Sequence, residues 1–236
     1  MKSSAGSEVV VTREALRRGV VGTLLASIPA GVRVRTEVEL CDSLHGMLSG
    51  HPDGEDVFVF GYGSLMWNPA VECVQIETAK VYGWHRRFCL RLMFGRGSVA
   101  VPGAMLGLDR GGSCCGVLLR ISASHAFDEL VLLWRREMST FTYQARWVEA
   151  VFNGNRVRAI TFVVDKSHQR YIGNLPIEQV AQMICTGHGV LGSCRHYFDE
   201  TLRALIRLGI TDVGMQKLQR AIGRIDRATV SVVPAQ

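Results

Sequence analysis

Glu137 is the residue of this chain best placed for acid–base chemistry. Apolar residues recur at helical spacing over 127–138, and Glu137 falls at the edge of that stripe, about 80° from Phe127 on a helical wheel. A carboxylate beside tryptophan and methionine loses part of its hydration, which raises its pKa and makes it a better base near neutral pH. The alternative is a boundary glutamate paired with Arg135, Arg136 or another helix.

A glycine-containing loop is the second feature that could do chemistry. Val57–Phe60 reads as a short buried strand, and it runs directly into Gly61-Tyr62-Gly63-Ser64-Leu65. Because glycine has no Cβ, backbone N–H groups in such a loop can approach a carboxylate or a developing oxyanion closely. A dinucleotide fingerprint is excluded because Met66 interrupts the glycine run, and a phosphate-binding loop because no lysine follows. An ordinary strand-to-turn junction is the alternative.

Four sequence blocks, in the same order as in the family, resemble the ChaC family of γ-glutamylcyclotransferases. The resemblance covers most of the chain and continues more weakly to about residue 220. The blocks are the loop just described with its strand, residues 83–89 (GWHRRFC), residues 102–117 (PGAMLGLDRGGSCCGV), and residues 133–148 around the WRREM sequence.

The resemblance implies an α+β fold, a small and mostly antiparallel β-barrel flanked by helices, with the loop at its mouth. It also implies breakdown of glutathione to 5-oxoproline and Cys-Gly without metal or cofactor, with Glu137 at the position of the family's catalytic glutamate. Tyr143 could donate its hydroxyl to the substrate or be an aromatic core residue, and Ser64 could contact the substrate or cap the turn. The candidate substrate-binding residues are Val59, Phe60, Gly61, Tyr62, Gly63, Ser64, Leu65 and Tyr143.

One carboxylate is enough for this reaction. The α-amine of a γ-glutamyl peptide attacks its own γ-carbonyl, closes a five-membered ring and expels the rest as an amine. Glu137 can take the proton from the attacking ammonium and then give one to the leaving nitrogen. The substrate supplies its own nucleophile, so the protein's main task is to hold it in an attack conformation.

Two alternative functions remain open. Cyclotransferases for other γ-glutamyl amines or γ-glutamyl amino acids share the loop and the glutamate. The WRREM block and Leu65, where asparagine is the alternative, favour the glutathione type. A non-catalytic regulatory binder on the same scaffold is disfavoured because a binder does not need the base.

Composition limits the remaining functions. The 236 residues carry a net charge of +6, but the arginines are dispersed, so nucleic acid is not an expected partner. The longest charge-free stretch, Gly19 to Val32, is too short and interrupted to span a bilayer. Seven scattered cysteines, with no CxxC pair, indicate free thiols in a reducing cytoplasm. Oligomeric state cannot be read from these residues.

One cluster of residue types suggests a metal. Cys185, His188, Cys194 and His196 place four nitrogen or sulfur ligands within twelve residues, although the spacing is not that of a standard zinc site. Three glycines nearby fit a loop between two helices equally well. We therefore expect no metal.

The chain is predicted to divide into an N-terminal helical extension (1–55), a single core domain (56–225) and a C-terminal tail (226–236). Helices are expected at 12–29, 36–48, 124–138, 176–185, 193–208 and 211–223. Strands are expected at 57–60, 71–81, 87–92, 104–108, 114–121, 142–152 and 156–164, with Asn153-Gly154 as a hairpin turn.

Overall fold

A closed β-barrel forms the centre of the computed structural model, which describes residues 11–26, 28–173 and 175–231. The strand order is β1-β3-β2-β4-β5, and β5 returns to β1 to close the barrel. Among the barrel strands of the described residues, only the β1–β5 pair is parallel. The predicted α+β fold with a small, mostly antiparallel barrel is therefore confirmed. The strands are β1 (Val57–Gly61), β2 (Gln75–Leu92), β3 (Gly103–Ile121), β4 (Tyr143–Phe152) and β5 (Asn155–Val164).

β2 and β3 are long, bent strands, and the prediction of four short strands in this region was wrong. They pair with each other along nearly their whole length, with a register shift between Tyr82 and Trp84. Gly83, at this shift, has a φ of +79°, which only glycine adopts easily. The gap predicted between the strands at 71–81 and 87–92 is therefore an irregularity inside one continuous strand. The Asn153-Gly154 hairpin turn is confirmed, with φ values of 48° and 77°.

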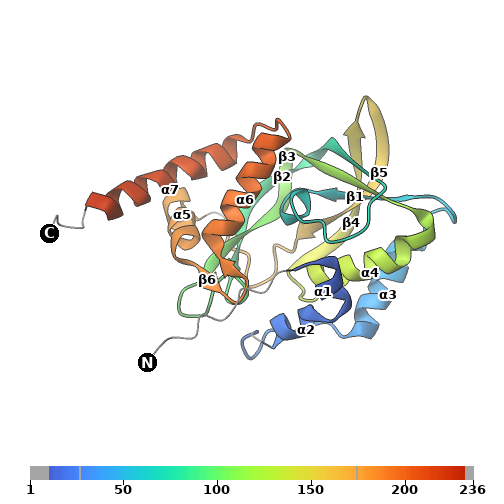
Figure 1. Cartoon of the computed structure of the whole chain (residues 1–236), viewed down its shortest axis with the longest axis horizontal. Helices are drawn as coiled ribbons and strands as arrows, with labels where there is room; N and C mark the ends of the chain where they lie inside the picture. Colours follow the sequence, from blue (N-terminus) through green and yellow to red (C-terminus); the bar gives the residue numbers. More distant parts are fainter. Residues whose placement is uncertain (1–10, 27, 174, 232–236) are drawn as a thin grey trace.

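Helices cover the barrel on two sides (Figure 1). α5, α6 and α7 lie together on one side, and α1 to α4 lie on the other. Two hydrophobic cores correspond to this arrangement, one joining the strands to α5–α7 and one joining them to α1, α3 and α4. The helices are α1 (Arg13–Arg17), α2 (Val20–Leu25), α3 (Glu37–Leu48), α4 (Ala126–Glu137), α5 (Ile177–Thr186), α6 (Cys194–Arg207) and α7 (Val213–Ser231).

Side-chain caps fix several helix starts at the predicted residues. Thr12 accepts a hydrogen bond from the Ala15 N–H, Thr36 forms a capping box with Glu39, and Ser193 accepts from the His196 N–H. A short 3-10 helix, η2 (Ala123–His125), precedes α4, so α4 begins at Ala126 and not at the predicted residue 124.

The N-terminal segment contains two short helices where one was predicted. Gly19, with a φ of +81°, separates α1 from α2. The predicted extension 1–55 holds α1, α2 and α3, with residues 1–10 outside the described part. The predicted boundary at residue 225 falls within α7, which continues to Ser231; residues 232–236 lie outside the described part. None of the described helices combines the length and apolarity needed to cross a bilayer.

Candidate active site

Glu137 is the last residue of α4, and its side chain is only 16% exposed. Burial raises the pKa of this carboxyl above its ordinary value, and the nearby charge of Arg136 offsets part of that rise. The Arg136 Nε lies 3.1 Å from the Glu137 Oε1. The two interpretations of this residue are thus compatible, because a glutamate paired with its neighbour is also desolvated enough to act as a base.

Arg136 connects Glu137 to the glycine loop. Its Nη2 donates to the Ser64 Oγ over 2.7 Å, and its Nη1 donates to the Asn68 carbonyl oxygen over 2.7 Å. A guanidinium is suited to contacts with several acceptors, since its N–H donors are held in a rigid plane. The end of α4 and the loop after β1 are therefore fixed relative to each other by one side chain.

The two loop glycines are required by close packing. A Cβ at Gly61 would lie 2.7 Å from the Leu65 Cβ, and one at Gly63 would lie 2.9 Å from the Tyr197 hydroxyl oxygen. Gly63 precedes a 3-10 helix, η1 (Ser64–Met66). As expected for the start of a helix, the N–H groups of Gly63, Ser64 and Leu65 donate to no described residue. They remain as donors for a ligand.

Two adjoining cavities meet at Glu137. The larger has a volume of about 300 Å³, and the smaller, of about 30 Å³, extends toward the loop. Residues that line both cavities are Ser64, Met105, Glu137, Tyr143 and Tyr197. A substrate that fills the larger cavity can therefore place one end beside both the carboxylate and the free N–H groups of the loop.

The N-terminal helices form part of the larger cavity's wall. Val11, Leu16, Val21 and Leu25 line it together with Glu137. The Asn68 side-chain amide donates to the Val11 carbonyl over 2.7 Å, which attaches this segment to the glycine loop. The wall of the site thus comes partly from a segment that sequence analysis left without a role.

The predicted substrate-binding residues fall into two groups. Tyr62, Gly63, Ser64, Leu65 and Tyr143 line the smaller cavity, whereas Val59, Phe60 and Gly61 line neither cavity. Val59 and Phe60 are completely buried in the barrel, where they support the loop. Substrate contact by these three residues stays a prediction that neither cavity supports.

The two predicted tyrosines use their hydroxyls internally. The Tyr62 hydroxyl donates to the Phe162 carbonyl over 2.7 Å, and the Tyr143 hydroxyl donates to the Leu106 carbonyl over 2.6 Å. Burial raises the pKa of both groups well above the ordinary value. Tyr143 is therefore a buried core residue that also forms part of the cavity wall, and donation of its hydroxyl to the substrate stays a prediction.

Sequence analysis missed Tyr197 and Arg170, which also line the larger cavity. The Tyr197 hydroxyl makes no hydrogen bond with the described residues, although the residue is only 7% exposed. Tyr197 lies on α6 and Arg170 in the segment between β5 and α5, and both are outside the four sequence blocks. Nothing in their local sequence distinguishes them from other core or surface residues, because only the fold brings them to the cavity.

The candidate zinc ligands do not converge. The Cys194 thiol donates to the Ala104 carbonyl over 2.8 Å, His188 lies exposed in the short strand β6 (His188–Gly189), and His196 lines the larger cavity. Among the described residues, no three His, Cys, Asp or Glu side chains are grouped so that they could hold a metal ion.

Fold and site together define a class: an α+β barrel protein with a desolvated carboxylate and a glycine loop at the mouth of a cavity. Residues 57–225 match the model of the family described as ChaC-like protein. The chain belongs to this ChaC-like family, as the four sequence blocks predicted.

Named relatives cover most of the chain. It is 36% identical over 217 residues to the glutathione-specific gamma-glutamylcyclotransferase of Escherichia coli, with 92% of this chain and 94% of the relative aligned. It is 29% identical to glutathione-specific gamma-glutamylcyclotransferase 1 of Mus musculus, over 67% of this chain and 70% of the relative. A crystal structure of a yeast gamma-glutamylcyclotransferase specific to glutathione shares the fold, with a TM-score of 0.67, 20% identity, and coverage of 72% and 96% of the two chains.

Proposed function

We propose that this protein is a γ-glutamylcyclotransferase that acts on glutathione, with Glu137 as its base and acid. The observation that carries the proposal is the position of Glu137, a desolvated carboxylate beside a loop with three free N–H groups. The names of the relatives from Escherichia coli and Mus musculus support glutathione as the substrate.

The reaction follows from this geometry. The γ-glutamyl end of glutathione lies where the two cavities meet, and the loop N–H groups that face the smaller cavity hold a carboxylate or the tetrahedral oxyanion. Glu137 takes a proton from the α-ammonium, and the freed amine attacks the γ-carbonyl carbon. The ring nitrogen carries two hydrogens after the attack and gives up one of them as the lactam forms. The bond to the cysteine nitrogen breaks as Glu137 returns its proton to that nitrogen, and the released amine takes up the proton of the ring nitrogen and leaves as an ammonium. The products are 5-oxoproline and Cys-Gly, and no group of the protein is bonded covalently to the substrate.

The Arg136 contacts support the same assignment. By fixing Ser64 and Glu137 relative to each other, Arg136 keeps the base and the donors of the loop in a constant geometry. Such positioning can contribute several kcal/mol to an intramolecular reaction. A protein that only bound a ligand would have no use for a base held in this way. A cytoplasmic location remains part of the proposal, and the seven free cysteines support it.

The test is incubation of purified protein with glutathione, with 5-oxoproline and Cys-Gly followed by mass spectrometry. Wild type should form both products in equal amounts, and Glu137→Gln should form neither while keeping the wild-type circular dichroism. Glu178→Gln, at an exposed glutamate 67% accessible and paired only with Arg224 among the described residues, is the matched control and should stay active. If wild type is inactive on glutathione but cyclises other γ-glutamyl amines, the proposed substrate is wrong. Inactivity on all γ-glutamyl compounds would refute the proposal that the protein is a cyclotransferase.

A further inference from the structure

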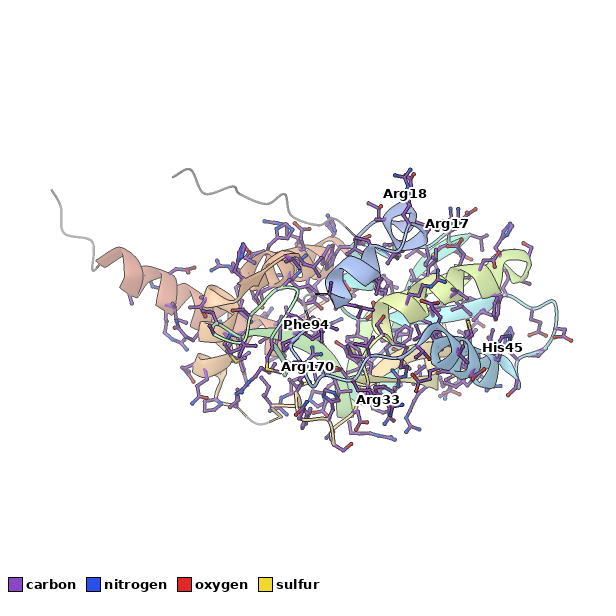
Figure 2. All side chains as sticks on the ribbon, turned by 90° about the horizontal axis from the view of Figure 1, so that it is seen from below. Arg17, Arg18, Arg33, His45, Phe94 and Arg170 are labelled. Atoms are coloured by element: carbon purple, nitrogen blue, oxygen red, sulfur yellow. The ribbon has the colours of Figure 1, made fainter. Side chains whose placement is uncertain are left out.

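Arg170 is a buried arginine in the wall of the cavity that contains Glu137. Only 2% of the surface of Arg170 is exposed. The Nε donates to the Arg91 carbonyl over 2.9 Å, the Nη1 donates to the Thr142 Oγ1 over 3.1 Å, and the guanidinium carbon lies 4.6 Å from the centre of the Phe94 ring. Figure 2 shows Arg170 and Phe94 next to each other. The guanidinium is therefore held in one orientation.

The backbone around Arg170 is also fixed. The Arg170 carbonyl accepts from the Arg91 N–H over 2.8 Å, and the Ile172 N–H donates to the Cys89 carbonyl over 2.8 Å. These bonds attach the segment between β5 and α5 to the end of β2. Arg170 is thus presented by a rigid part of the barrel wall, as a binding group must be.

The charge of Arg170 has no carboxylate partner among the described residues. Buried Arg86, by contrast, pairs with Asp212 over 2.6 Å. The Nη2 of Arg170 makes no hydrogen bond with any described group, although no fully enclosed side-chain nitrogen in the described part lacks a partner. This nitrogen must therefore be open to the cavity that Arg170 lines. Burial lowers the pKa of Arg170 below its ordinary value, and Tyr143, not a carboxylate, offsets part of that effect.

A buried cation without an anion is costly, because its lost hydration is not replaced. The bonds to Arg91 and Thr142 explain how the side chain is oriented, but a neutral side chain could make them without the cost of the charge. A bound carboxylate would supply the missing negative charge, and the planar fork of arginine matches a carboxylate with two parallel hydrogen bonds.

We propose that Arg170 is the binding site for the C-terminal carboxylate of the substrate. The inference rests on the proposed function and adds the substrate class, which is γ-glutamyl peptides that end in a free carboxylate. In glutathione this group belongs to the glycine, and an extended chain places it about 7 Å from the γ-carbonyl, two residues away. Arg170 bonds Thr142, whose neighbour Tyr143 lines the cavity with Glu137, so the two sites lie in one continuous cavity.

The experiment measures kcat/KM of wild type, Arg170→Gln and Arg170→Lys on two substrates, glutathione and glutathione whose glycine carboxylate is converted to the amide. For wild type, the amide should lower kcat/KM about 10- to 100-fold, mainly through KM, since a hydrogen bond to a charged group is lost. For Arg170→Gln the two substrates should give nearly equal values, and Arg170→Lys should lie between. Arg158→Gln, a control arginine stacked on Trp147 and outside the cavity lining, should keep the wild-type ratio.

The ratio separates this site from a purely structural role of Arg170. If Arg170 only supported the fold, its loss would lower kcat/KM equally for glutathione and for the amide. The ratio of the two kcat/KM values would then stay at the wild-type value, which would overturn the proposal. If Arg170→Gln does not fold, inhibition of wild type decides: Cys-Gly should inhibit at least tenfold better than its C-terminal amide, and equal inhibition would overturn the proposal. Wild type that is active on glutathione but accepts the amide equally well refutes this site alone, whereas inactivity on every γ-glutamyl compound refutes the proposed function.

Discussion

Arg136 donates from its Nη2 to the hydroxyl oxygen of Ser64 over 2.7 Å, and this bond joins the end of α4 to the loop that follows β1. The two residues are 72 positions apart in the chain. The same guanidinium lies against Glu137, so one side chain sets both the geometry of the site and part of its electrostatics.

Arg136→Gln should lower activity and shift its pH dependence. The charge of Arg136 lowers the pKa of Glu137, so its removal leaves burial to raise that pKa further. Because the base must be ionised, the acidic limb of the kcat/KM profile should move to higher pH. Loss of charge-assisted bonds to the loop should also lower the plateau about 10- to 100-fold. The measurement is a pH–rate profile on glutathione.

Arg135→Gln is the control for this change. Arg135 is the preceding residue of α4, but it pairs with exposed Glu37 at the surface over 3.0 Å. It should leave both the profile and the plateau unchanged. An unshifted acidic limb in Arg136→Gln would show that Arg136 does not influence the base.

Glu137→Gln should leave the protein at least as stable as wild type at neutral pH. Burial raises the folded-state pKa of this carboxyl, so the folded state holds its proton more tightly than the unfolded chain does. The stability from this group is therefore present below the unfolded pKa and is lost as pH rises through the folded pKa. Urea unfolding at pH 4 and pH 7.5 should show that the free energy of unfolding of the variant, relative to that of wild type, is higher at pH 7.5 than at pH 4. A large loss of stability at pH 7.5 would contradict the desolvated state of Glu137.

Tyr197→Phe and Tyr143→Phe should separate substrate binding from stability. The Tyr197 hydroxyl has no partner among the described residues and lines both cavities, so its removal should lower kcat/KM about 2- to 10-fold with little change in unfolding. The Tyr143 hydroxyl donates to a buried carbonyl, and its loss should cost about 1 kcal/mol of stability. Kinetics and urea denaturation of both variants provide the comparison. Equal loss of stability in the two would contradict the free state of the Tyr197 hydroxyl.

Glu129→Gln should detach the N-terminal segment. The Glu129 side chain is 1% exposed, accepts from the Arg13 Nε over 3.0 Å and from the Glu72 N–H over 2.8 Å, and also contacts Arg17 over 3.6 Å. Burial alone would raise the pKa of this carboxyl, but the Arg13 and Glu72 bonds lower it below the ordinary value. Breaking a buried pair of this kind costs about 3 kcal/mol.

The same pair predicts a pH dependence. Because the folded-state pKa of Glu129 is depressed, its contribution is present above the unfolded pKa and is lost as pH falls through the folded pKa. Wild type and Glu129→Gln should therefore converge in stability at acidic pH. Glu14→Gln, at an exposed glutamate of α1 that pairs with Arg18, should show no comparable effect at any pH. Parallel stability curves for Glu129→Gln and wild type would contradict this account.

Three buried cysteines should resist alkylation while the protein is folded. Burial raises the pKa of the thiols of Cys114 and Cys194 to about 11, and of Cys89 to about 12, so almost no thiolate forms at pH 7.5. Iodoacetamide should leave these three unmodified in native protein and label all seven cysteines in urea, as read by peptide mass spectrometry. Native labelling of Cys194 would show that its bond to Ala104 opens readily.

Several ends of helices and one turn were predictable because their signals are local. Caps such as Thr36 and Ser193 and the Asn153-Gly154 turn each depend on a few adjacent residues, and the structure confirms them. Strand continuity was not predictable, because Gly83 can end a strand or form an irregularity within it, and only pairing with β3 decides. The barrel itself came from the family resemblance rather than from periodicity.

The site was predictable only where it coincides with the sequence blocks. Glu137, Ser64 and Tyr143 were found because each lies in or beside a block, and all three line the cavities. Arg170 and Tyr197 come from segments with no local signal, and their significance lies in one Nη2 and one hydroxyl that make no hydrogen bond with any described group. A missing partner is a property of three-dimensional packing, so sequence cannot display it.

The wall formed by Val11, Leu16, Val21 and Leu25 lies outside residues 57–225, the part matched by the family model. Proteins can therefore share the barrel, the loop and the glutamate while differing in the shape of the entrance to them. Changes in this segment can alter which molecules enter the cavity without altering the residues that carry out the reaction. Grouping such proteins by their barrels alone would not separate those that differ in this wall.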